Sequence, residues 1–430
     1  MGTDMRYLSI LTCLVFFFGC TAAQPTQADS DWPQFRGADG TGAVPDAKTV
    51  TKLDPATGEN IKWATDMPGP TAGTPAIFGD YVFTTAGTVE KNRLVAMGLS
   101  RSTGKILWQH DVGEARQSRG RNRENNHAVC SPAADDKHAY FLFGNGDLFA
   151  VTHDGKKKWH INLTEKYGKI EILWGYASSP LLMDGKLYVM VLRRQPSFLL
   201  CIDPATGDIL WKQDRPTDAE GESPESYASP IAATIEGKSQ VVCYGGDALT
   251  GHDAETGKEL WRFTQDINPT NNKMFRVISG PTQGLNGVIY FTTPRGTDLF
   301  AVEVKGNKPK LKWSAEDVEA DVPCPVYTKD AIYILSGQKK QLFKFNPETG
   351  EKLAHTRIDT PGHFRCGPTY ANGHLYMTDY DGDFFVFSTG DGFKKVSHLS
   401  LGGYPSRATI AVAGDDLFIR TGNRLICAGK

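Results

Sequence analysis

A phrase that joins a tight turn to a tryptophan recurs along the chain and restricts its fold more than any other feature. In LLCIDPATGDILWKQDR (199–215), an apolar segment precedes a D-P-A-T-G turn and a second segment containing tryptophan. Related phrases stand at 94–111 and 249–263. Asp and Thr suit such a turn because their side chains bond nearby backbone groups, and Gly207 suits a positive φ. The recurrence predicts an array of similar short units.

Six tryptophans set the period of this array. Successive members are 45, 51, 52, 50 and 52 residues apart, and they are Trp63, Trp108, Trp159, Trp211, Trp261 and Trp313. A small residue before a proline recurs in step with them, as in SPAAD (131–135) and SPLLM (179–183). The tryptophan series continues with smaller residues at Ala354 and near Val396, and the proline series ends in a weaker copy at ATIAV (408–412), so the units number eight.

Each unit carries four short strand signals separated by turns, which is typical of a β-propeller blade. The sequence therefore predicts an all-β, eight-bladed β-propeller of four-stranded antiparallel blades. The segment TGENIKWATD (57–66) precedes the first complete unit, and the last unit (408–430) has only three strand signals. We expect the N-terminal strand to complete the last blade and close the ring, because closure removes two exposed sheet edges.

Composition agrees with a turn-rich β protein and leaves the partner open. The chain has 45 Gly and 24 Pro among 430 residues, which favours many short strands and turns. Its 47 Lys and Arg nearly balance its 49 Asp and Glu, so no nucleic-acid partner is predicted.

The N-terminus has the features of an export signal. Arg6 precedes the apolar run 7–19, which is too short to span a bilayer as a helix. The run ends at Cys20 in a sequence that resembles a bacterial lipoprotein cleavage box, although Phe17 stands where that pattern usually has Leu. We expect a signal peptide over 1–20, lipidation of Cys20, a flexible tether over 21–30 and the propeller over 31–430. Ordinary signal cleavage within 20–23 is the alternative.

Export makes the other cysteines informative, because an oxidising compartment permits disulfides. Six remain after Cys13 and Cys20 are set aside, namely Cys130, Cys201, Cys243, Cys324, Cys366 and Cys427. Six cysteines allow 15 pairings. Most of them stand in apolar strand contexts, so we expect small buried core residues.

The phrase D-P-A-T-G-x-x-x-W, with S-P and D-G-K-L-Y-V upstream, resembles the PQQ-like repeat of quinoprotein-type β-propellers. That family includes quinoprotein dehydrogenases and BamB-like exported lipoproteins. The opening DWPQFRGADGTG (31–42) is similar to the start of many exported members. The dehydrogenases carry a vicinal Cys-Cys pair and a calcium held by Glu, Asn and Asp, and haem-bearing relatives add C-x-x-C-H. This chain has neither cysteine motif, and the calcium triad maps onto none of its residues, so the resemblance implies the scaffold of the family.

Loops that lead into the inner strands should converge beside the central channel, and they carry large polar and aromatic residues. The candidates are Asn126, His127, Trp174, Tyr176, Tyr227, Arg276, Arg365 and Arg407. Arginines with aromatics suit an anionic ligand, a sugar or a peptide strand. Solvated or loop-bracing roles are the alternative for each of them.

These observations predict an exported, non-catalytic binding or assembly module of the cell envelope, similar to BamB. We expect lipid anchoring in the outer membrane and an envelope protein or polymer as partner. No catalytic residue, metal ligand or cofactor is predicted. A divergent oxidoreductase using PQQ and Ca²⁺, with ligands from Asp247, Asp298, Asp321 or Asp381, is one alternative. A glycan-binding propeller using Trp174, Tyr176 and Tyr227 is another.

Overall fold

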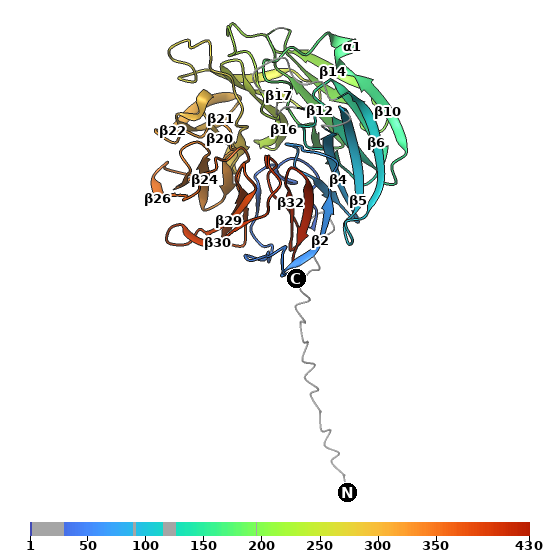
Figure 1. Cartoon of the computed structure of the whole chain (residues 1–430). Helices are drawn as coiled ribbons and strands as arrows, with labels where there is room; N and C mark the ends of the chain where they lie inside the picture. The colour runs from blue at the N-terminus through green and yellow to red at the C-terminus, as the bar shows by residue number, and fades with distance from the viewer. Residues whose placement is uncertain (2–29, 89–91, 115–125, 195) are drawn as a thin grey trace.

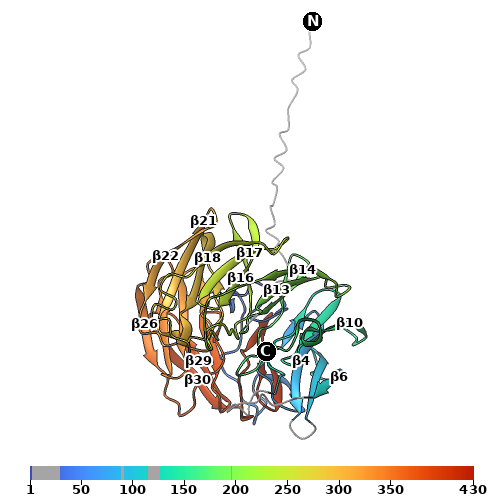
Figure 2. The same ribbon diagram turned by 90° about the horizontal axis from the view of Figure 1, so that it is seen from above.

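The repeats fold into eight four-stranded antiparallel blades arranged in a ring, and the short strand β1 (Ala43–Val44) adds to the inner edge of one blade in parallel. The computed structural model describes residues 1, 30–88, 92–114, 126–194 and 196–430. In Figures 1 and 2 the chain runs round the ring from blue through green and yellow to red. The eight-bladed propeller predicted from the sequence is confirmed.

Strands are added from the channel outward in each of the first seven blades. Blade 1 contains β3 (Ala76–Phe78), β4 (Tyr81–Thr88), β5 (Arg93–Ser100) and β6 (Ile106–Glu114). Blade 2 contains β7 (Ala133–Ala134), β8 (His138–Leu142), β9 (Asp147–Thr152) and β10 (Lys157–Asn162). Blade 3 contains β11 (Leu181–Met183), β12 (Lys186–Val191), β13 (Phe198–Ile202) and β14 (Ile209–Asp214). Blade 4 contains β15 (Ile231–Ile235), β16 (Lys238–Gly245), β17 (Ala248–Asp253) and β18 (Glu259–Phe263).

The second half of the ring repeats this order. Blade 5 contains β19 (Thr282–Gln283), β20 (Val288–Thr292), β21 (Leu299–Lys305) and β22 (Lys308–Ala315). Blade 6 contains β23 (Val326–Thr328), β24 (Ala331–Ser336), β25 (Gln341–Phe345) and β26 (Lys352–Arg357). Blade 7 contains β27 (Thr369–Ala371), β28 (His374–Thr378), β29 (Asp383–Ser388) and β30 (Lys394–Ser400). Blade 8 contains β31 (Ala411–Ala413), β32 (Asp416–Arg420), β33 (Arg424–Ala428) and, as its outer strand, β2 (Ile61–Asp66).

The N-terminal strand closes the ring as the sequence predicted. β2 pairs antiparallel with β33, with Trp63 opposite Cys427. In Figure 1 the blue β2 lies beside the dark red strands of the last blade. The N–H of Gly429 donates to the carbonyl of Asn60 at 3.0 Å, so the two parts of the chain meet where the ring closes.

The tryptophan and the turn of the recurring phrase form contacts between neighbouring blades. The indole N–H of Trp159 in blade 2 donates to the carbonyl of Pro204 in the D-P-A-T-G turn of blade 3, at 2.9 Å. A Cβ atom added to Gly207 of that turn would lie 2.7 Å from Cδ2 of Trp159, so the indole packs directly on the glycine. The tryptophan of blade 2 therefore docks on the turn of blade 3.

Four other tryptophans dock in the same way. Their N–H groups donate to turn carbonyls of the next blade, in the pairs Trp63–Arg101, Trp108–His153, Trp211–Ala254 and Trp313–Pro347. Trp261 differs, because the turn of blade 5 (305–308) has the sequence KGNK in place of the T-G pattern. Its N–H donates instead to Oε1 of Gln240 within its own blade, at 2.7 Å.

One end of the channel is closed by residues 31–44, here called the plug segment, which includes β1 (Ala43–Val44). It crosses under the ends of the inner strands and bonds to successive blades through both backbone and side chains. Its partners are Ile77 in blade 1, Ala134 in blade 2, Leu182 in blade 3, Pro281 at blade 5, Pro325 at blade 6 and Tyr370 in blade 7. The side of the ring that it covers is the plug face, and the opposite side is the mouth face.

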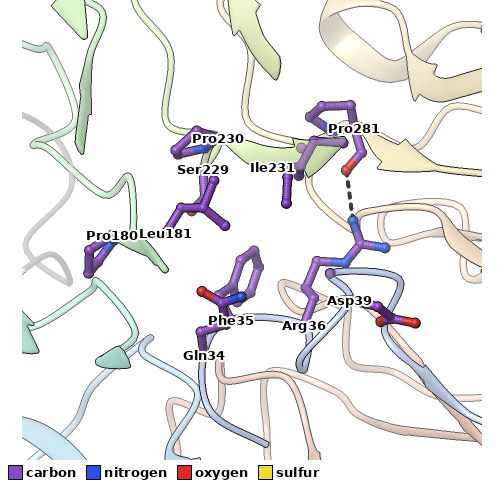
Figure 3. Close-up of a pocket in the computed structure, with 13 residues that line it drawn as sticks. Gln34, Phe35, Arg36, Asp39, Pro180, Leu181, Ser229, Pro230, Ile231 and Pro281 are labelled. Atoms are coloured by element: carbon purple, nitrogen blue, oxygen red, sulfur yellow. Dashed lines mark hydrogen bonds between the residues drawn. The ribbon is translucent and has the colours of Figure 1, made fainter. Parts of the chain in front are cut away.

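Arg36 is the centre of the plug segment. Its side chain is buried and donates to the carbonyls of Pro281 at 2.9 Å and of Thr41 at 2.9 Å, and to the carbonyl of Pro325. Figure 3 shows the guanidinium reaching Pro281, with Phe35 turned toward blade 4 beside it. Because a buried guanidinium needs hydrogen-bond acceptors, these carbonyls fix the segment in one position.

The short helix α1 (Leu163–Tyr167) leads out of blade 2. In the described part of the chain, the structure has no helix that is both long and apolar enough for a membrane span. Apart from Met1 and Ser30, the predicted signal peptide over 1–20, with Cys20, and the tether over 21–30 lie outside the described residues.

Candidate functional site

The loops that enter the inner strands meet in the channel on the mouth face and enclose a cavity of about 120 Å³. All eight blades contribute to its wall, and Phe35 of the plug segment contributes from below. The contributing side chains on the blades include Ser131, Ser179, Tyr227, Ser229, Cys324, Arg365, Cys366, Arg407 and Thr409. The convergence of these loops beside the channel is as the strand order predicted.

The small residues before the prolines connect neighbouring blades around this cavity. The hydroxyl of Ser131 accepts from the N–H of Thr74, that of Ser179 from Ser131, and that of Ser229 from Ser179, each at 2.9 Å. Farther round the ring, the thiol sulfur of Cys324 accepts from the N–H of Gly280 at 3.1 Å. The small residues of this marker therefore link blades 1 to 4, and blades 5 and 6, where their inner strands begin.

The charged side chains that line the cavity are both arginines. Arg365 enters from blade 7 and is exposed, whereas Arg407 enters from blade 8 and is half-buried. Among the described residues, the lining includes no Asp or Glu. Three of the eight predicted mouth residues, Arg365, Arg407 and Tyr227, thus line the same cavity.

Three aromatic candidates are built into the loops of blades 3 and 4. Tyr176 is 1% exposed and its hydroxyl donates to the carbonyl of Met190 at 2.8 Å. Tyr227 donates to the carboxylate of Glu225 at 2.9 Å and accepts from the backbone N–H of Trp174 at 3.1 Å. Burial raises the pKa of both tyrosines, and the Glu225 charge adds to the shift at Tyr227. Both phenols therefore stay neutral and brace the rim, and the buried ring of Tyr176 has no free face for a sugar.

The remaining candidates have bracing contacts or lie beside one. Arg276 forms a two-pronged ion pair with Asp321, at 3.2 and 3.0 Å, which joins the loops before blades 5 and 6. The side-chain N–H group of Asn126 donates to the carbonyl of Pro70 at 2.9 Å. His127 has φ of +65° and its backbone carbonyl accepts from Gly144. These contacts match the bracing alternative for Arg276 and Asn126.

An aromatic group at blades 7 and 8 was missed by the sequence reasoning. Tyr404 is 60% exposed. Its ring packs edge-on against Tyr380, with ring centroids 5.0 Å apart. Tyr380 in turn stacks on His363 at 4.8 Å. The loops DYDGD (379–383) and GGYPS (402–406) carry these tyrosines, so aromatic residues in mouth-face loops were the available signal.

All six cysteines after Cys20 are free and buried. Burial raises the pKa of the Cys201 thiol to about 11 and that of Cys243 to about 12. The prediction of small buried core residues is confirmed for Cys201, Cys243 and Cys427, which lie in strands. Cys324 and Cys366 instead line the channel cavity.

Two of the four aspartates named for the alternative of a quinone with calcium, Asp321 and Asp247, are engaged with neighbouring side chains. Within the described ranges, no three His, Cys, Asp or Glu side chains come close enough to share a metal ion. Asp321 is held by Arg276, and Asp247 by the amide of Asn268 at 3.0 Å. The channel cavity is also well below the roughly 300–1,000 Å³ of sites for ligands of drug size.

A larger polar cleft, of about 750 Å³, lies between the outer parts of blades 3 and 4. Its wall includes Asp214, Asp218, Asp247, Glu259 and Arg262. Burial raises the pKa of Asp247. Arg262 is paired with Glu259 at 2.6 Å, so the cleft keeps an acidic surplus.

Comparison with known proteins agrees with this geometry. The family model described as "Outer membrane protein assembly factor BamB", of the PQQ-like repeat class, matches residues 31–221 and 175–356. The chain belongs to this family. The structure of BamB from Moraxella catarrhalis is similar, with a TM-score of 0.60 and 14% identity, over 86% of this chain and 99% of that one. Quinohemoprotein alcohol dehydrogenase from Comamonas testosteroni has a TM-score of 0.66 and 11% identity, over 93% of this chain and 80% of that one.

Curated relatives include enzymes. A tetrathionate hydrolase from Acidithiobacillus ferrooxidans is 23% identical over 75% of this chain and 65% of its own length. A polyvinylalcohol dehydrogenase from a Pseudomonas species is 25% identical over 48% of this chain and 37% of its own length. The chain thus spans less than two thirds of the length of either relative. The sequence similarity extends to proteins named for catalysis as well as to an assembly factor.

Proposed function

We propose that this protein is an exported binding module of the cell envelope that holds a partner on its mouth face. The observation that carries the proposal is the way the mouth is built. Tyr176, Tyr227, Arg276 and Asn126 are engaged with neighbouring loops, so their role is to make a rigid rim. A rigid surface favours binding because little conformational entropy is lost when a partner docks.

The placement of the N-terminus supports this role. Asp31 lies on the plug face, where its carboxylate accepts from the N–H of Gly79 at 3.2 Å and pairs with Arg101 at 3.1 Å. A chain anchored through Cys20 would therefore present the opposite, mouth face to the periplasm. The family description and the lipoprotein-like sequence at Cys20 support an outer-membrane location.

Site-specific photocrosslinking in the native envelope tests the proposal. A photoreactive phenylalanine analogue at Tyr404 would probe the mouth face, and the same analogue at Leu285, which is 59% exposed between β19 and β20, would probe the plug face. We expect a discrete adduct with a second envelope component at Tyr404 and none at Leu285. Adducts at Leu285 alone, or none at either position, would contradict the proposal.

A second candidate is an enzyme acting at the channel on an anionic substrate. Two observations favour it, namely similarity to a tetrathionate hydrolase over 75% of the chain and a cavity lined by Arg365 and Arg407. Incubation of the purified protein with tetrathionate, followed by assay of thiosulfate and sulfate, distinguishes the two candidates. Turnover that is lost in Arg365→Gln would favour the enzyme, and its absence would favour the binding module.

A further inference from the structure

The channel cavity has a charge opposite to that of the whole molecule. The chain carries a formal net charge of −2, whereas the charged side chains among the described residues of the cavity wall are Arg365 and Arg407. Guanidinium groups in a narrow opening with low-dielectric walls attract anions, since the field lines are focused there. The cavity is therefore selective for negative charge.

The guanidinium of Arg365 is available to a ligand. Arg276, on the same face, is bound in its two-pronged pair with Asp321, which offsets its charge. Arg365 has no ion pair within the described part of the chain, and its side chain is exposed. An arginine without a carboxylate partner presents a planar set of N–H donors that matches the oxygen spacing of an oxyanion.

The size and the neutral lining of the cavity limit the ligand further. The cavity volume of about 120 Å³ is small for a drug-sized ligand but admits a small ion. Hydroxyls of Ser131, Ser179, Ser229 and Thr409 lie in the wall, and Phe35 closes the end toward the plug face. Such a space holds a small oxyanion, and the ligand would approach from the mouth face.

We propose that the channel binds a small tetrahedral oxyanion, a sulfate-type or phosphate-type dianion, between Arg365 of blade 7 and Arg407 of blade 8. The oxygens of the anion accept hydrogen bonds from both guanidinium groups, and Phe35 lies on the side toward the plug face. Because the two arginines come from adjacent blades, the bound anion links the mouth loops of blades 7 and 8. The site is independent of partner docking, so it stands or falls separately from the proposed function.

Calorimetric titration of the purified protein at constant ionic strength tests the site. The probes are sodium sulfate, thiosulfate and phosphate, with chloride as the monovalent control. We expect saturable binding at one site for at least one dianion and none for chloride. A preference for sulfate and thiosulfate would assign the ligand to the sulfur oxyanions, and a preference for phosphate would assign it to the phosphates.

Three variants locate the binding. Arg365→Gln and Arg407→Gln should each weaken binding about tenfold or more, because each removes charge-assisted hydrogen bonds. Arg357→Gln changes an exposed arginine at the end of β26 that is outside the cavity wall and should leave the affinity unchanged. Anion-dependent stabilisation in a thermal unfolding assay gives a second readout, which Arg365→Gln should abolish without lowering the melting temperature of the anion-free protein.

Two results would overturn the proposal. One is the absence of heat and of thermal stabilisation with all three dianions up to about 10 mM, where a millimolar site would be saturated. The other is binding that Arg365→Gln and Arg407→Gln leave as strong as in Arg357→Gln, since the anion would then sit elsewhere on the surface.

Discussion

His252 is a fully buried histidine in β17 whose ring holds a turn in place. Its Nδ1 lies 3.1 Å from the carbonyl of Gly257, and its Nε2 lies 3.0 Å from the hydroxyl of Thr250. Gly257 belongs to the turn that receives Trp211 of the preceding blade. The protonation state of the His252 imidazole therefore affects the turn on which Trp211 packs, and with it the contact between blades 3 and 4.

Burial lowers the pKa of His252 from 6.5 to about 4, with nearby Arg215 adding a smaller effect. The unfolded chain binds a proton between these two pH values and the folded chain does not, so stability is lost as the pH falls from 6.5 toward 4. We expect this residue to contribute roughly 2–3 kcal/mol to the acid destabilisation between pH 7.5 and pH 4.5. Urea unfolding at both pH values should show a smaller difference for His252→Gln than for the native chain.

The exposed His355 on β26 provides the control, since His355→Gln should keep the pH dependence of the native chain. An unchanged pH dependence in His252→Gln would mean that other groups account for the acid destabilisation.

At the scale of strands and turns, the contact between tryptophan and glycine gives the clearest prediction. Gly207 and Gly185 both adopt positive φ, +81° and +69°. A methyl group on Gly207 would press against Trp159, whereas one on Gly185 would meet nothing within 4 Å. Both alanine variants lose about 1–2 kcal/mol from the backbone. Gly207→Ala should lose about 1–3 kcal/mol more, because the indole must move. Urea unfolding measures both, and equal losses would show that the turn does not support the indole.

The strands and turns also show which parts of the fold could be predicted from the sequence. Tryptophan spacing and small-residue-proline pairs gave eight blades and the closing β2, because these signals are local and repeat. The plug segment was not predicted, since DWPQFRGADGTG has no strand periodicity and its role depends on carbonyls of distant blades, such as that of Pro281.

The mouth residues were located by their loops, but their contacts could not be read from the sequence. Arg276 finds Asp321 across 45 residues, and nothing in the sequence near either residue indicates the pair. Arg365 and Arg407 stand in similar loops, and no Asp or Glu stands among the described residues that line their cavity. The charged side chains that surround an arginine in the folded protein, and not its residue type, distinguish a bracing arginine from one that can bind a ligand.

At the scale of the whole ring, two devices depend on residues before the first complete blade. β2 completes blade 8 and inserts Trp63 against blade 1, where its N–H donates to the carbonyl of Arg101 at 2.8 Å. The plug segment bonds to blades 1 and 7, the two neighbours of blade 8. Closure and plugging can be separated, because Asn60 lies against Gly429 and a short linker can join the chain ends there.

A permuted chain tests this separation. It begins at Met67, continues through Lys430 and a short linker, and ends with 60–66, so it keeps β2 and lacks the plug segment. A truncated chain of 67–430 lacks both, leaving β33 as an open edge and the Trp63 site empty. We expect the permuted chain to unfold cooperatively in urea with a reduced free energy of unfolding. The truncated chain should lose about 3–5 kcal/mol more, because it also lacks the buried side chain of Trp63. If the two chains were equally stable, the ring would hold without its closing strand, and the inter-blade contacts of the other tryptophans would suffice to keep blades 1 and 8 together.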